Sequence, residues 1–166
     1  MCDKREREFL LTQTAMQILD SVLSTSQVIL VFGATLVSIL ILDAIWFMLI
    51  AREFTRSSLN VWLNDRINWY AAGALYVILA AGIVIFVVLP AIDHRTGAGL
   101  PITTPAIYGA IFGLVAYSTY ELTNLATVKN WPLKFALVDI VWGCVLASAA
   151  SVVGTSFGEW LLRTKC

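Results

Sequence analysis

Four long apolar segments constrain this chain more than any other feature of its sequence. They cover residues 28–50, 70–89, 106–125 and 135–157, and roughly 20 apolar residues in helical conformation are enough to cross the hydrocarbon layer of a bilayer. Only 13% of the chain is charged, whereas a soluble domain usually carries about 25%. We therefore expect an all-α, polytopic membrane protein, whose fold is a four-transmembrane-helix bundle.

The four-helix membrane domain is predicted to occupy residues 28–158, with a distinct segment on either side. Residues 1–27 begin with mixed charges and continue with apolar residues at helical spacing, which predicts an N-terminal amphipathic helix at the membrane surface. A cleaved targeting segment is the alternative, and three acids among the first eight residues argue against a transit peptide. Residues 159–166 are predicted to form a short polar tail.

The polar segments indicate candidate partners of the protein but not its orientation in the membrane. Residues 51–69 mix basic and aromatic side chains, a composition that is typical of the membrane interface. This segment and residues 1–27 are the candidate contacts with other membrane subunits, and membrane lipids are the general partner. The charges balance at 11 basic and 11 acidic residues, so nothing favours nucleic acid. Basic residues divide almost equally between the two sides, so the positive-inside rule sets neither orientation nor membrane.

Three acids interrupt the apolar segments: Asp43, Glu121 and Asp139. Asp43 and Glu121 lie near the ends of the first and third segments, and Asp139 lies near the start of the fourth. If the helices alternate in direction, these ends are on one side of the membrane, so all three acids lie in the same leaflet. An acid that faces lipid costs about 2.5–3.5 kcal/mol on the insertion scale. We therefore expect these carboxyl groups to face inward, where they share protons, cations or hydrogen-bond donors.

Neighbouring residues extend this prediction to a candidate polar pocket. Tyr117, Tyr120 and Asn124 share one helical face with Glu121. An Asp-x-x-Trp pattern occurs in the first and the fourth apolar segment, and its Trp could donate an indole N–H or form a wall of the pocket. The complete candidate pocket is Asp43, Trp46, Tyr117, Tyr120, Glu121, Asn124, Asp139 and Trp142.

A purely structural network is the alternative reading of the same residues. Glu121 could accept a hydrogen bond from Tyr76 or Asn124, and Asp139 could cap the electropositive start of its helix. No catalytic, nucleotide-binding or cysteine-pair motif occurs, so no cofactor is evident and an enzymatic activity is left open. A bound metal would be a divalent cation held by carboxylates.

The same segments resemble a known family. The residues that carry the resemblance are GAIFGLVAYSTYELTNLATVKNWPLKFALVDIVWG, preceded by LDAIWF and FVVLPAI. They are similar to an uncharacterised family of four-helix integral membrane proteins, domain of unknown function 2177, over about residues 36–151. The resemblance implies four membrane spans and no defined activity. The family usually has Asp where this chain has Glu121, and residues 1–27 are not part of the family pattern.

Three functions follow as hypotheses. The first is an acidic pocket near one membrane face that binds a cation or a lipid head group. The second is a non-catalytic accessory subunit of a larger membrane complex. The third is a small dimeric proton-coupled transporter, which is less favoured because a coupling acid is expected near the midplane.

Overall fold

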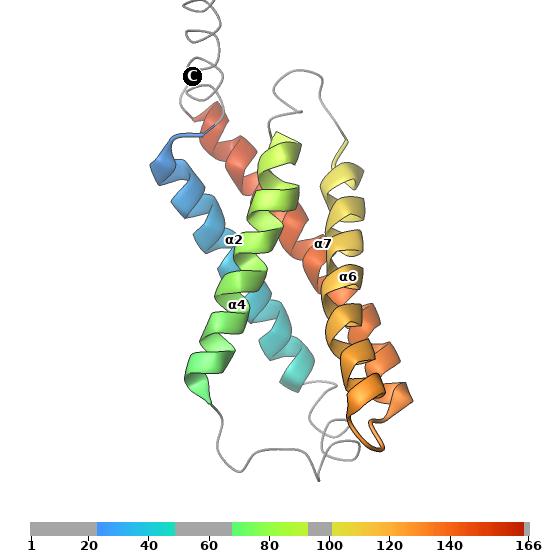
Figure 1. The fold of residues 1–166 in the computed structure, drawn as a ribbon. Helices are drawn as coiled ribbons and strands as arrows, with labels where there is room; N and C mark the ends of the chain where they lie inside the picture. The colour runs from blue at the N-terminus through green and yellow to red at the C-terminus, as the bar shows by residue number, and fades with distance from the viewer. Residues whose placement is uncertain (1–22, 49–67, 93–100, 165–166) are drawn as a thin grey trace, which may run out of the picture.

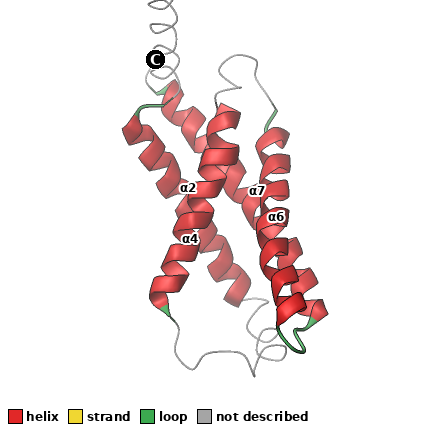
Figure 2. Cartoon of the chain, viewed as in Figure 1, coloured by secondary structure: helices red, strands yellow, loops and turns green. Residues whose placement is uncertain are grey.

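The computed structural model describes residues 23–48, 68–92 and 101–164, and this part of the chain is entirely helical apart from short turns (Figure 2). The predicted amphipathic helix at 1–27 and the interfacial segment at 51–69 fall almost wholly outside these residues. The elements in chain order are α2 (Thr25–Trp46), α4 (Trp69–Ile83), the π-helical turn η2 (Val84–Val88), α6 (Thr103–Thr127) and α7 (Leu133–Arg163).

Successive helices run in opposite directions, so the end of α2, the start of α4, the end of α6 and the start of α7 lie at one end of the bundle (Figure 1). Three helices are long and apolar enough to cross a membrane, namely Thr25–Trp46, Trp69–Ile92 and Leu133–Arg163. The helix α6 is not among them, because hydroxyl, amide and carboxyl side chains fill its second half. The all-α fold is confirmed, and the fourth span stays a prediction.

The helices extend beyond the limits expected from the apolar segments. The largest difference concerns Pro90, which directly follows the apolar segment 70–89 but lies inside the second helix, since this helix continues to Ile92. Proline removes a backbone donor and clashes with the preceding turn of a regular helix. Here the preceding turn is the wider η2, in which the Leu89 N–H bonds to the Val84 carbonyl. The π-helical turn thus relieves the clash and keeps the helix continuous.

The first and last turns of α6 and α7 also differ from expectation. Pro105 precedes the apolar segment 106–125, but it lies in the first turn of α6, where the N–H that proline lacks would have no helical partner anyway. The helix α7 continues through Arg163, so the residues expected to form a polar tail begin inside it. Helical hydrogen bonds satisfy the backbone there, whatever the polarity of the side chains.

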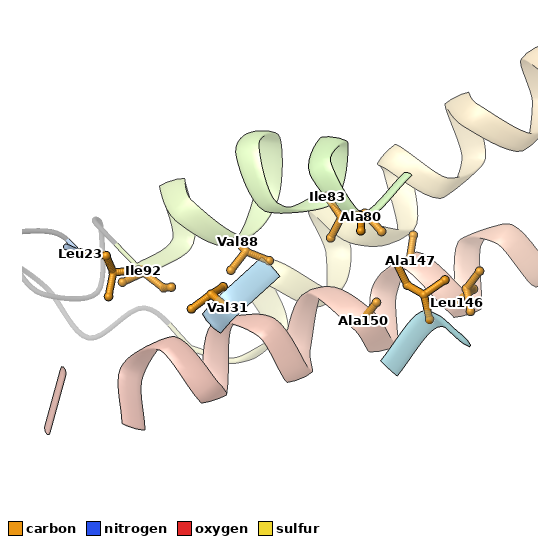
Figure 3. Packing of buried hydrophobic residues seen from close by; sticks show 10 residues of the cluster. Leu23, Val31, Ala80, Ile83, Val88, Ile92, Leu146, Ala147 and Ala150 are labelled. Atoms are coloured by element: carbon orange, nitrogen blue, oxygen red, sulfur yellow. The ribbon is translucent and has the colours of Figure 1, made fainter. Parts of the chain in front are cut away.

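The core lies where α2, the η2 region and α7 meet (Figure 3). Its side chains are mostly small or β-branched, so the helices approach closely. A Cβ on Gly154 would come within 3.0 Å of Val88, and one on Gly158 would overlap with Ile92. The buried cluster consists of Leu23, Val31, Ile39, Ala80, Ile83, Val88, Ile92, Leu146, Ala147 and Ala150.

The antiparallel contact between α6 and α7 has a regular register. Gly109 faces Ser151, and Gly113 faces the backbone of Gly143 and the side chain of Ala147. One step further, Tyr117 lies on Gly143. Each step of four residues along α6 is therefore matched by a step of four along α7, and this register continues toward the acids near the hairpin turn.

Candidate functional site

The end of α2, the end of α6 and the start of α7 lie at the hairpin end of the bundle (Figure 1), and these three helix ends contain the three predicted acids. Glu121 is six residues before the end of α6, and Asp139 is six residues after the start of α7, so both lie about 9 Å inside the helix ends at 1.5 Å per residue. Asp43 belongs to the last turn of α2. The structure therefore brings acids from three helices to one end, but it does not give them one common environment.

Glu121 is the most deeply buried of these acids, with 0% of its surface exposed. The indole N–H of Trp131 donates to its Oε2 over 2.8 Å. Trp131 lies in the tight turn between α6 and α7, where Asn130 adopts a left-handed conformation with a φ of 62°. Asparagine tolerates this conformation better than most residues. The turn thus places an aromatic donor directly over the buried carboxyl group.

The carboxyl group of Asp139 lies within hydrogen-bonding range of the Glu121 carboxyl. Ionised carboxyl groups only accept hydrogen bonds, so this contact is unfavourable unless a proton or another donor group joins the two carboxyls. Tyr117 lies beside this pair and is close enough to interact electrostatically with both Asp139 and Asp43. Asp139 is seven residues into the helix from the N-cap residue Pro132, so it is not a helix cap.

Asp43 is held by a different set of partners. The indole N–H of Trp142 donates to its Oδ1 over 2.8 Å, and Tyr76 on α4 is its hydrogen-bonding neighbour. The ring of Trp46 stacks on Trp142 with the centroids 4.4 Å apart and an interplanar angle of 9°. The two Asp-x-x-Trp patterns therefore meet across the α2–α7 contact, where Trp142 donates to the Asp of the other pattern and Trp46 stacks on Trp142.

The two remaining predicted pocket residues on α6 have different surroundings. Tyr120 is 57% exposed, and its ring meets Trp131 edge-on at 6.5 Å, so it packs on the turn and stays outside the acid pair. Asn124 is partly buried, and its Nδ2 has no hydrogen-bond partner among the described residues. Glu121 Oε1 is likewise buried, with no N–H or hydroxyl donor from that part of the chain.

Sequence reasoning did not include Trp131 and Tyr76 in the pocket. Trp131 lies between the third and fourth apolar segments, and the signal that could have found it is its place between two acids that the hairpin brings together. Tyr76 was considered as a donor to Glu121, but it lies beside Asp43. The antiparallel order of the helices does not reveal which acid faces α4, and the packing of α4 against α2 decides it.

Chemically, the site is a buried pair of carboxyl groups with an aromatic cover, and it contains an unpaired acceptor and an unpaired donor. Within the described ranges, no group of three or more Asp, Glu, His or Cys side chains is arranged to hold a metal ion. A cation at this position would have at most the two carboxylates as acidic ligands, with other oxygen atoms completing its coordination.

Comparison with known proteins adds one finding. A family model described as "Predicted membrane protein (DUF2177)" matches residues 28–156. This range contains both Asp-x-x-Trp patterns and the whole acid pair. Neither the curated proteins nor the solved structures include a match to this chain.

Proposed function

Because the chain belongs to the DUF2177 family of predicted membrane proteins, we propose that it holds a ligand-binding site within the membrane, built on Glu121 and Asp139. The ligand is a group that donates hydrogen bonds to a carboxylate, carried by a cation or by the polar part of a lipid. One observation carries the proposal: Glu121 is completely buried, yet one of its carboxyl oxygens lacks a protein donor in the described part of the chain.

The energetic argument rests on the cost of such a group. A buried polar atom without a hydrogen bond costs about 1–3 kcal/mol, and more if it is charged. Trp131 donates to Oε2 of Glu121 and not to Oε1, whereas a carboxylate has about four acceptor positions. Polar residues inside a membrane bundle generally mark functional sites. A bound donor group removes this cost.

Asp43 takes a different role in this proposal. Its contacts with Trp142 and Tyr76 already supply donors from two helices. We therefore assign Asp43 to holding α2, α4 and α7 together, and the binding role to the Glu121–Asp139 pair.

The proposal also includes a fourth membrane span. At 25 residues, α6 is about 37 Å long, which exceeds the roughly 30 Å of the hydrocarbon layer. It packs antiparallel to α7, with Gly109 and Gly113 in close contact with that helix. Three of its hydroxyl groups are satisfied by the helix itself, since Thr119, Thr123 and Thr127 each donate to the carbonyl four residues earlier. Cysteines introduced at positions 103 and 130 should therefore react with an impermeant reagent from opposite sides of the membrane, and labelling from one side argues against the span.

The binding site is tested with purified protein in mild detergent. Native mass spectrometry of the wild type should show lipid-sized or ion-sized adducts, and Glu121→Gln and Asp139→Asn should reduce them. Thr123→Val is the matched control, since Thr123 is exposed and its hydroxyl bonds only to its own helix. Identical adducts in the wild type and in both acid variants, with all proteins folded, would refute the proposal.

A further inference from the structure

Glu121 and Asn124 present complementary groups on the same face of α6. Glu121 Oε1 is an acceptor and Asn124 Nδ2 is a donor, and both atoms are buried without a partner among the described residues. Residues three apart on a helix have Cβ atoms about 5–6 Å apart, so one oxygen atom can reach both groups. An ammonium group only donates and a phosphate oxygen only accepts. A hydroxyl group does both.

The surroundings restrict the molecule that carries this hydroxyl. Glu121 is six residues from the end of α6, hence about 9 Å inside the helix. The adjoining Asp139 repels an anionic phosphate at this depth. Trp131 covers the site, and its ring packs edge-on against Phe135 at 6.0 Å, so the boundary on this side is aromatic. A hydroxyl attached directly to an apolar body fits both the depth and the charge.

We propose that Glu121 and Asn124 recognise the hydroxyl group of a neutral lipid alcohol, with diacylglycerol as the representative ligand. The inference rests on the proposed function and names the ligand class of the same site. The hydroxyl donates to Glu121 Oε1 and accepts from Asn124 Nδ2. Trp131 fixes the carboxyl group by holding Oε2, so that Oε1 is left for the ligand. Asn124 is the specificity-determining residue, because a ligand that only donates leaves its Nδ2 unpaired.

The first test compares ligands on the wild-type protein and requires no variant. Protein in phosphatidylcholine-containing detergent micelles is titrated with dioleoylglycerol or with trioleoylglycerol, which lacks the hydroxyl, and the bound fraction is measured by native mass spectrometry. We expect at least roughly tenfold tighter binding of dioleoylglycerol, since a site built to bond a hydroxyl discriminates strongly against an analogue without it. Equal binding of the two lipids overturns the inference.

Two further arms separate the competing sources of a donor group. Phosphatidylethanolamine offers an ammonium group, and its preferential binding overturns the lipid-alcohol assignment while leaving the proposed function intact. Free glycerol offers hydroxyls without an apolar body, and competition by glycerol as effective as that by dioleoylglycerol overturns the membrane source. Absence of binding in every arm overturns the inference, and is the result expected if Glu121 and Asn124 hold only a water molecule. The proposed function is overturned as well only if the ion-sized adducts described above are also absent.

Variants then assign the recognition to the two residues. Asn124→Leu removes the donor at similar volume and should weaken dioleoylglycerol binding about tenfold, the equivalent of one good hydrogen bond, with a smaller effect on phosphatidylethanolamine. Glu121→Gln keeps a partner for Trp131 and replaces the free acceptor by a donor, so it should weaken both lipids. Thr123→Val should change neither. An Asn124→Leu variant that binds dioleoylglycerol like the wild type overturns the role of Asn124.

Discussion

Replacing Gly113 by alanine tests whether close contact between α6 and α7 determines the stability of this bundle. A Cβ on Gly113 would overlap with the carbonyl group of Gly143 and would lie 2.9 Å from the Cβ of Ala147. The backbone of α7 cannot rotate away as a side chain can, so the two helices must separate.

The magnitude follows from two opposing effects. Forcing an extra carbon into a packed interface typically costs about 1–3 kcal/mol, and a clash with backbone places this substitution near the upper end. Alanine in place of glycine inside a helix gains about 1 kcal/mol. The net expectation is a loss of about 2 kcal/mol in the free energy of unfolding.

Gly33→Ala is the matched control, because a Cβ on Gly33 in α2 would have no heavy atom within 4 Å. This variant should gain about 0.5–1 kcal/mol through helix propensity alone. Both variants can be compared with the wild type by titration with SDS in mixed micelles, followed by far-UV circular dichroism. If Gly113→Ala is as stable as Gly33→Ala, the α6–α7 contact is looser than described and the register argument fails.

Three further predictions concern the hairpin turn and the indole contacts. Asn130→Gly should leave the thermal unfolding midpoint unchanged or raise it slightly, whereas Asn130→Val should destabilise the protein by about 1–2 kcal/mol, because a β-branched residue resists a positive φ; equal midpoints for the two variants contradict this. Trp142→Phe should cost about 1.5–3 kcal/mol, the value of a hydrogen bond to a charged group, and a double-mutant cycle with Asp43→Leu should show coupling of at least about 0.5 kcal/mol; additive effects would mean that the two residues do not interact. Trp131→Phe should destabilise the protein by a similar amount while the circular dichroism spectrum stays helical, and this loss should vanish in a Glu121→Leu background; a loss that persists in that background places the role of Trp131 in packing.

The family match and the helix pattern extend across most of the chain, whereas the site depends on contacts between helices. The acids were predictable as a group, since apolar segments that alternate in direction bring Asp43, Glu121 and Asp139 to one end of the bundle. Their partners were not predictable. The pairing of Asp43 with Trp142 crosses from α2 to α7, and no spacing within either helix contains that information.

The sequence by itself determined that this protein lies in a membrane, where its helices run and which helix faces pack together. Hydrophobic length and helical periodicity, on which these conclusions rest, are local properties. Small side chains permit close approach of helices, and Gly109 and Gly113 indeed lie against α7. Only the tertiary structure decided that Pro90 is accommodated by a π-helical turn, that Trp131 rather than Tyr76 donates to Glu121, and that Asp43 contacts Trp142 and Tyr76 whereas Glu121 and Asp139 lie together. These outcomes depend on register and crossing geometry, which are set by the simultaneous fit of several helices and cannot be derived from any one of them.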